Sequence, residues 1–348
     1  MTTLTIDPTG PRTGGTSTAR RLLGGALRSR EIAVAVVLIL VIAATTLKNP
    51  HFLVGDNGWR DLLLTPSIML LLAVGQTAVI ITRSVDLSVG SVVGLTAYLV
   101  GRVFIDHPGT PIIVIFAIGL VFGGLLGLIN GVLVSWGKVP ALVITLGTMY
   151  IYRGAFLSWA GSKRINASDM PDSFLSLGTK QIGSIPVLTI IAVVVLAIVG
   201  YYLYTARSGR EFYAIGSDPD AAQLYGLRVT RRVLSAFILS GAMAGLAGVA
   251  YAARYGTVSS NAGLNLELQA VGAAVIGGVA IFGGSGTVWG AAIGAFLLVT
   301  INRALPVLGV QDFWQQFVVG VLIIGAIVLD RVLSLRRDRK LTEARDAV

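Results

Sequence analysis

Seven polar residues lie within or beside long apolar segments, where the chemistry open to them is hydrogen bonding to a solute. They are Gln76, Asp86, Asn130, Thr145, Glu267, Gln269 and Asn302. Ionisable groups are costly in lipid and are therefore candidates for a functional role. For Gln76, Asn130, Thr145 and Asn302, each taken alone, a hydrogen bond between helices is the favoured explanation. Asp86 could also cap the helix that follows it, with Arg83 as its ion-pair partner.

The positions of the other six residues suggest what they would meet. Glu267 and Gln269 open an apolar segment on its expected outer side, where an entering solute would reach them first. The amides and hydroxyl at 76, 130, 145 and 302 lie inside apolar segments and could hydrogen-bond a polyol. We therefore predict a substrate pathway built from these seven residues.

Several other chemistries are excluded by composition. The chain has no Cys and only two His residues, His51 and His107, each alone in a short polar link, so neither a disulfide framework nor a zinc cluster is expected. None of its five Lys residues precedes Ser or Thr, which rules out a phosphate-binding loop of the G-x-x-x-x-G-K-[ST] type. We expect no ATPase activity, no enzymatic activity, and no metal or cofactor held by this chain.

The hydrophobicity of the chain requires lipid as its solvent. Of 348 residues, 54% are apolar and 13% are charged, and the mean hydropathy is +0.80. A soluble protein of this length cannot bury so many apolar residues. We predict an all-α, polytopic membrane protein with about ten spans. They are 32–47, 62–82, 86–105, 111–134, 139–160, 185–205, 233–253, 267–282, 287–302 and 313–330.

This pattern gives one membrane domain, 32–331, between a tail at 1–31 that we expect to be disordered and a basic tail at 332–348. The first apolar segment could be a signal peptide, but 31 residues precede it, which favours a retained span. With both termini in the cytoplasm, Lys and Arg favour the inner segments by about two to one. The net charge of +10 therefore suits anionic lipid headgroups, and no nucleic acid partner is expected.

The longest inner connection, 206–232, contains a predicted short helix. Asp218 and Pro219 have the residue types of an N-cap and first helical position, and Gly226 can end the helix. A solvated linker would not need a capped helix that presents Leu224 and Tyr225. We interpret this helix as an interaction element on the cytoplasmic face.

Two further patterns concern the scaffold. Residues 78–94 align without gaps on 274–290, which predicts a same-direction internal repeat with the pathway between its copies. Glycines recur at every fourth position in three spans, where they would let helices approach closely. These ridges are Gly119, Gly123, Gly127 and Gly131; Gly241 and Gly245; and Gly286, Gly290 and Gly294.

Over residues 32–331 the chain resembles the permeases of ABC importers for ribose, xylose, rhamnose and related sugars. The resemblance rests on the order of four segments: VGQTAVIITRSVDLSVGS (74–91), NGVLVSWGKVPALVITLGTMYIYRG (130–154), GREFYAIGSDPDAAQLYG (209–226) and AVGAAVIGGVAIFGGSGTVWGAAIGA (270–295). Within the family, TRSVDLSVGS and LGTMYIYRG are most similar to permeases for autoinducer-2 and rhamnose. Ser217 departs from the Gly or Asp found in many relatives.

The resemblance implies the partners and a mechanism. Two permease chains, identical or paired with a sister chain, would form the pore in the bacterial inner membrane. An ATPase subunit with two nucleotide-binding domains would bind ATP and Mg, and an external sugar-binding protein would deliver the solute. The loop 209–226 would be the coupling helix, seated in the ATPase by its small residues. The residues implied are Gly209, Arg210, Glu211, Ala214, Gly216, Asp218, Ala221, Ala222 and Gly226.

Three alternatives remain at this point. A permease for branched-chain amino acids or nucleosides would share the cytoplasmic loop and the late glycine-rich spans. An ion-driven secondary transporter would more often carry a carboxylate relay deep in the membrane. A membrane-embedded enzyme would need catalytic residues, and the polar loops contain no nucleophile–base set.

Overall fold

A computed structural model describes residues 30–55, 57–161, 163–311 and, from 314 to 328, all but 315, 323 and 326. The described chain is mainly α-helical, and its one sheet is a hairpin of β1 (Gln181–Ile182) and β2 (Ile185–Pro186). The predicted tails at 1–31 and 332–348 lie outside the described residues, apart from residues 30 and 31, which start the first helix.

Eight helices in the described part of the chain are long and apolar enough to cross a membrane. They are α2 (Arg30–Lys48), α3 with α4 (Gly58–Leu64 and Pro66–Ile81), α5 (Val89–Asp106), α6 (Ile112–Gly137), α7 (Ala141–Ala160), α9 (Val187–Thr205), α12 (Val229–Tyr255) and α14 (Val288–Val307). The predicted all-α, polytopic fold is confirmed. The tenth predicted span, 313–330, is described only in part, and the described residues from 314 to 328 are helical.

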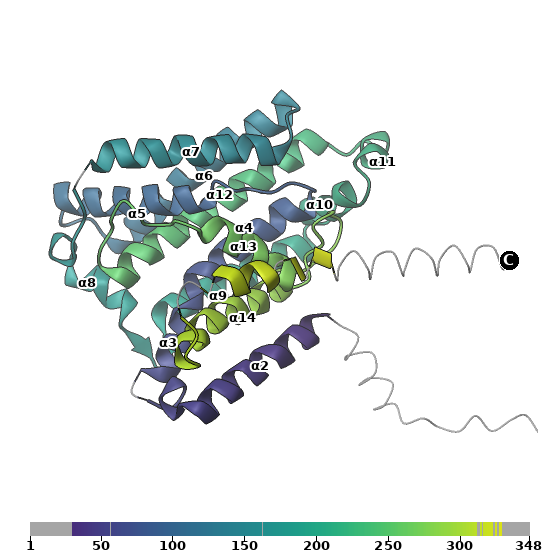
Figure 1. The fold of residues 1–348 in the computed structure, drawn as a ribbon. Helices are drawn as coiled ribbons and strands as arrows, with labels where there is room; N and C mark the ends of the chain where they lie inside the picture. The colour runs from purple at the N-terminus through teal and green to yellow at the C-terminus, as the bar shows by residue number, and fades with distance from the viewer. Residues whose placement is uncertain are drawn as a thin grey trace, which may run out of the picture.

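Short elements mark the two ends of the helix bundle (Figure 1). One end, which we call the α8 end, carries η2 (Ala167–Asp169), α8 (Asp172–Leu175), η3 (Ser176–Gly178) and the β hairpin, so the connection between α7 and α9 contains short helices and strands. At the opposite end, the α11 end, lie α10 (Arg207–Ser217) and α11 (Pro219–Leu224). The 3-10 turn η1 (Pro50–Phe52) joins α2 to α3.

The predicted span 267–282 is wrong in its second half. Its helix, α13 (Leu266–Ile276), has only 11 residues, too few to cross the hydrocarbon. The chain then turns through Gly278, Gly283, Gly284 and Gly286, all with positive φ angles, before α14 begins. A positive φ is accessible to glycine at little cost, so this glycine-rich stretch forms a loop where a helix was predicted.

Helices α4 and α12 form the centre of the bundle. Every residue of α4 is buried, and α12 lies against α4, α5 and α6. The contact between α6 and α12 is made by two of the predicted glycine ridges. A Cβ atom on Gly123 would overlap the carbonyl oxygen of Gly241, and one on Gly245 would overlap that of Gly119. The backbones therefore touch, as is typical of close helix packing in lipid.

The third predicted ridge is only partly helical. Gly290 and Gly294 lie on α14 and pack against the backbone of α13 and of Gly277. Gly286, predicted as the first member of the ridge, precedes α14 and has a φ of +131°. It serves the loop between α13 and α14 rather than the helix contact.

The internal repeat is visible as two units of helix, break and helix. The first is α4, residues 82–88 and α5; the second is α13, residues 277–287 and α14. The two breaks touch each other, because Gly283 lies against Arg83, and Gly284 N donates to the O atom of Ile81, the last residue of α4, at 2.9 Å. The first turns of α4 and α13 also line one cavity at the α8 end. The two copies therefore run in the same direction, as predicted.

Candidate functional site

Four of the seven predicted pathway residues meet in a buried polar cluster at the first break. Asp86 is 1% exposed, and its Oδ1 accepts hydrogen bonds from the amide and the hydroxyl of Ser88, at 3.0 and 2.7 Å. Its Oδ2 accepts from Ser240 of α12 at 2.9 Å, and Asn130 of α6 approaches Oδ1 at 3.4 Å. The carboxylate thus joins the break to two helices.

The remaining contacts of this cluster are to the backbone of the same break. Gln76 donates to the carbonyl oxygen of Asp86, and Thr145 of α7 donates to that of Val85 at 3.1 Å. These four side chains are buried, and each bonds to the protein. Their geometry supports a structural role in holding the break between the helices.

The predicted pairing of Asp86 with Arg83 is wrong, and so is the role of Asp86 as helix cap. The N-cap position of α5 is occupied by Ser88 and not by Asp86. Arg83 points toward α10 and away from Asp86. Its Nε donates to Gly216 O at 2.6 Å, and its Nη2 donates to Ser217 O. Arg83 has a φ of +61°, which turns the chain toward α10 at this point.

Two other predicted residues line a cavity at the α8 end. The cavity has a volume of about 340 Å³ and is enclosed by α3, α4, α12, α13 and α14. Its lining residues are Asp61, Thr65, Ile68, Met69, Tyr251, Tyr255, Leu266, Gln269, Val299, Asn302 and Arg303. This volume is at the small end of the range of about 300–1,000 Å³ for small-molecule sites, which suits a compact ligand.

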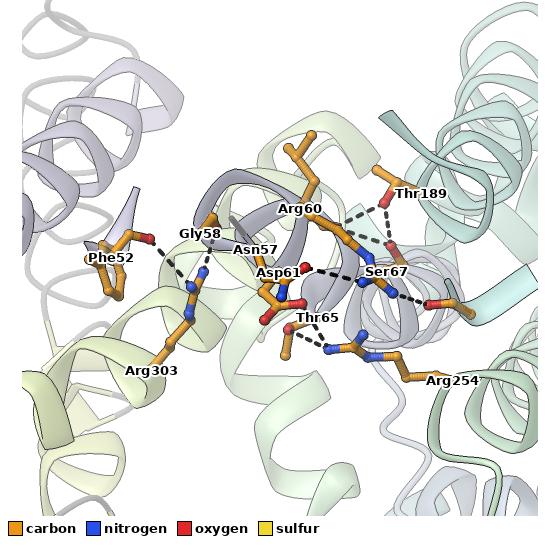
Figure 2. A network of polar contacts seen from close by, with 12 residues as sticks. Phe52, Asn57, Gly58, Arg60, Asp61, Thr65, Ser67, Thr189, Arg254 and Arg303 are labelled. Carbon is orange, nitrogen blue, oxygen red and sulfur yellow. Dashed lines mark hydrogen bonds and ion pairs between the residues drawn. The ribbon is translucent and has the colours of Figure 1, made fainter. Parts of the chain in front are cut away.

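The charged groups at this cavity already have protein partners (Figure 2). Arg254 lies 3.5 Å from Asp61 Oδ1 and donates to Thr65 Oγ1 at 3.4 Å. Arg303 donates to Gly58 O at 3.0 Å and Phe52 O at 3.3 Å, and its guanidinium lies 4.7 Å from the centre of the Phe52 ring. The charged side chains of Asp61, Arg254 and Arg303 are therefore largely engaged in contacts with the cavity wall.

Other lining groups remain available for hydrogen bonds. The amide oxygen of Asn302 is buried, and no described residue donates to it. Gln269 lines the same space, as do Tyr251 and Tyr255, whose ring centres lie 4.5 Å apart. The cavity therefore combines neutral hydrogen-bonding groups with aromatic faces, which is the composition of a site for an uncharged polar solute.

Glu267 does not join this cavity. Its carboxylate lies against Gly90 of α5, where a Cβ atom would overlap it. Sequence reasoning also missed Asp61, Thr65, Tyr251, Tyr255 and Arg303. The sequence carries one indication of this site: a charged residue lies just outside each of three predicted spans, at positions 61, 254 and 303.

At the α11 end the predicted short helix is present. Asp218 caps α11, since its Oδ1 accepts from the amides of Asp220 and Ala221 at 3.1 and 3.0 Å, and Pro219 occupies the first turn. Leu224 and Tyr225 are 89% and 87% exposed. Gly226 follows with a φ of +79°. The exposed apolar tip favours an interaction element.

Several small residues predicted to seat this helix in a partner instead pack within the chain. Ala222 is 5% exposed, and Gly209 and Gly216 are buried. A Cβ atom on Gly209 would overlap Tyr202 O, and one on Gly216 would overlap Ile81 O. Their small size is thus required by the fold of this chain, which corrects the expected seat at Ala222.

The polar residues of α10 also have partners in the chain. Glu211 pairs with Arg232 at 2.6 Å and with Arg207 at 3.3 Å, and Arg210 donates to Thr205 O at 2.9 Å. Ala214 is exposed and Ala221 is partly buried. The surface left for a partner is therefore the tip of α11 and the exposed side of α10. Among the described residues there is no group of three or more His, Asp or Glu side chains that could hold a metal.

Comparison with known proteins places this arrangement among permeases. The family model described as "Branched-chain amino acid transport system / permease component" matches residues 59–327. The chain is 35% identical over 304 residues to the autoinducer 2 import system permease protein LsrC of Enterobacter sp. (strain 638), covering 87% of each chain. No solved structure matches the chain.

Two further relatives carry the same name. The LsrC protein of Escherichia coli O9:H4 (strain HS) is 36% identical over 274 residues, covering 79% of each chain. That of Salmonella typhimurium (strain LT2) is 38% identical over 279 residues, covering 79% of this chain and 78% of the relative.

Proposed function

Because this chain belongs to the family of permease components of branched-chain amino acid type transport systems, and is a multi-pass protein of the inner membrane, we propose that it is the membrane-spanning subunit of an ABC importer for autoinducer-2 or a similar sugar-like solute. The observation that carries the solute class is the identity of 35–38% to autoinducer 2 import permeases over most of the chain. The chain translocates its solute and breaks no bond in it. ATP and Mg would bind to a separate ATPase subunit, and an external binding protein would deliver the solute.

The direct test is tracer uptake. A strain lacking this gene is complemented with the wild-type gene and given autoinducer-2, rhamnose, ribose, xylose, galactose or leucine, with and without energy depletion. We expect loss of autoinducer-2 or sugar uptake in the deletion strain and its restoration by the gene. Restored uptake of leucine alone would favour the branched-chain amino acid alternative, which the family description keeps open.

The second part of the proposal is that α11 contacts the ATPase, which requires the α11 end to face the cytoplasm. The exposed tip, Leu224 and Tyr225, supports this role because no packing within the described chain accounts for it. We expect Leu224→Ser with Tyr225→Ser to lower copurification of the ATPase from mild detergent, at unchanged membrane abundance. Gln223→Ser, exposed on the same helix, is the matched control.

An ion-driven transporter would give the opposite outcome in this assay. It would show no ATPase in the purified complex, and uptake would collapse with the ion gradient while ATP is maintained. Asp86, the buried carboxylate that such a mechanism would use first, is held by Ser88 and Ser240 in the present geometry.

A further inference from the structure

We infer that the cavity at the α8 end is a binding site for an uncharged, hydroxyl-rich solute of about monosaccharide size. This inference rests on the proposed transport function and names the site and the solute class that the permease itself recognises. The cavity is distinct from the buried cluster around Asp86, in which every side chain bonds to the protein and the Oε1 atom of Gln76 has no partner among the described residues.

The choice of ligand class follows from which groups are free. An amino acid carries an ammonium and a carboxylate, and it needs opposite charges that are available to bind them. Here Asp61 pairs with Arg254, and Arg303 is bonded to two carbonyl groups and stacked on Phe52. A zwitterion could bind these charges only by displacing the ion pair, the hydrogen bonds and the ring contact that hold the cavity wall.

The neutral groups fit a polyol instead. The Asn302 amide oxygen is buried without a donor, a state that costs free energy unless a hydroxyl or a water fills it. Gln269, also on the lining, adds both a donor and an acceptor. The paired rings of Tyr251 and Tyr255 offer apolar faces to the C–H side of a ring.

The place of the cavity in the fold supports a role in transport. Its walls include the first turns of α4 and α13 and residues 299–303 of α14, so both copies of the repeat contribute to it. At their other ends these same helices meet at the two breaks. Movement of one copy against the other would therefore change the cavity, as expected of a site at a repeat interface.

A different cavity, of about 570 Å³ at the end of α2, does not fit a polar solute. Its walls are Ile39, Ile42, Ala43, Thr46, Leu47, Pro50 and Leu53, and almost all of the exposed wall area is apolar. We therefore place the solute at the α8 end.

The test uses the absence of cysteine from the natural chain. Gln269→Cys is introduced into the whole importer, in right-side-out membrane vesicles, and labelled with a membrane-impermeant methanethiosulfonate. We expect millimolar autoinducer-2 or ribose to slow labelling, while leucine leaves the rate unchanged. Ser173→Cys, exposed on α8 at the same end, is the control and should label at one rate throughout.

A second variant removes the free acceptor. Asn302→Leu should lower the uptake rate about tenfold at equal membrane abundance, as expected for the loss of one hydrogen bond to the solute. Thr300→Val is the matched control. Its hydroxyl is also buried without a partner on α14, but it does not line the cavity. It should stay within about twofold of wild type if only the cavity-lining acceptor contributes to solute binding.

The outcomes separate the two proposals. If leucine slows the labelling of Gln269→Cys and the polyols do not, the proposed solute class is overturned. No protection by any solute, with normal uptake by Asn302→Leu, would overturn the cavity as a site while the importer function stands. A wild-type gene that restores no uptake would overturn the proposed function itself.

Discussion

At the scale of single residues, the buried Asp86 carboxylate links the first break to α6 and α12. Ser88, Ser240 and Asn130 all donate to it. Asn130 also donates to Ser88 Oγ at 2.7 Å, so removing the acceptor in Asp86→Ala leaves the buried hydroxyls of Ser88 and Ser240 without it, at a cost of about 1–3 kcal/mol each. We expect a lower melting temperature of the purified protein in detergent, measured by size-exclusion chromatography after heating.

Two variants make this residue-scale prediction specific. Asp86→Asn keeps an acceptor for Ser240 and should melt between wild type and Asp86→Ala. Ser135→Ala removes a buried hydroxyl that has no partner and should melt like wild type. If Asp86→Ala also melts like wild type, the carboxylate has no structural role, and its role in transport should be examined instead.

Residue types alone could indicate that Asp86, Gln76 and Asn130 were unusual, but not which of their two roles holds. The distinction depends on which donors surround each group, and those donors come from helices far apart in the sequence. For Asn302, too, the residue type does not indicate which role the side chain has. It resembles Asn130 in the sequence, yet it is a lining residue of a cavity, whereas Asn130 donates to a carboxylate.

At the scale of elements, the seam between α6 and α12 gives a sharp contrast between neighbouring glycines. A Cβ atom on Gly123 would overlap Gly241 O, whereas one on Gly124 would lie 3.8 Å from its nearest neighbour, Ala242 Cβ. Gly123→Ala should therefore push the helices apart and lower the melting temperature and membrane abundance. Gly124→Ala should not, because it adds only helix propensity and an ordinary contact.

Equal melting temperatures for Gly123→Ala and Gly124→Ala would contradict the close packing of α6 on α12. The pattern of the seam is available from sequence because a glycine at every fourth position lies on one helix face. The capped start of α11 was predictable for the same reason: Asp218 and Pro219 act on the next few residues. The early end of α13 was missed because apolar and glycine residues alternate there, and hydropathy does not distinguish a helix from a loop inside a protein.

At the scale of the whole molecule, the contacts between α10 and the two breaks form one connected unit. Arg83 donates to Gly216 O and Ser217 O, and Gly284 N donates to Ile81 O. The α10–α11 segment therefore contacts both copies of the repeat. The repeat itself was visible in the sequence, but the contact between its breaks was not, since it joins residues about 200 positions apart in the chain.

This arrangement predicts a variant that separates assembly from transport. Gly216 has no room for a Cβ atom, which would overlap Ile81 O and lie 2.5 Å from Gly284 N. Gly216→Ala should displace the breaks from α10 and leave the tip of α11 unchanged. We expect the ATPase to copurify normally, while solute uptake driven by ATP falls by at least about tenfold, which corresponds to about 1.4 kcal/mol.

Ser217→Ala is the control for this prediction, because Arg83 bonds to the backbone oxygen of Ser217 and its side chain is exposed. It should transport like wild type. Loss of copurification in Gly216→Ala would mean that α10 and α11 form one docking surface rather than a link to the breaks. Normal uptake in Gly216→Ala would show that motion reaches the repeats by another route, through α9 or α12, the membrane helices that flank the segment in the chain.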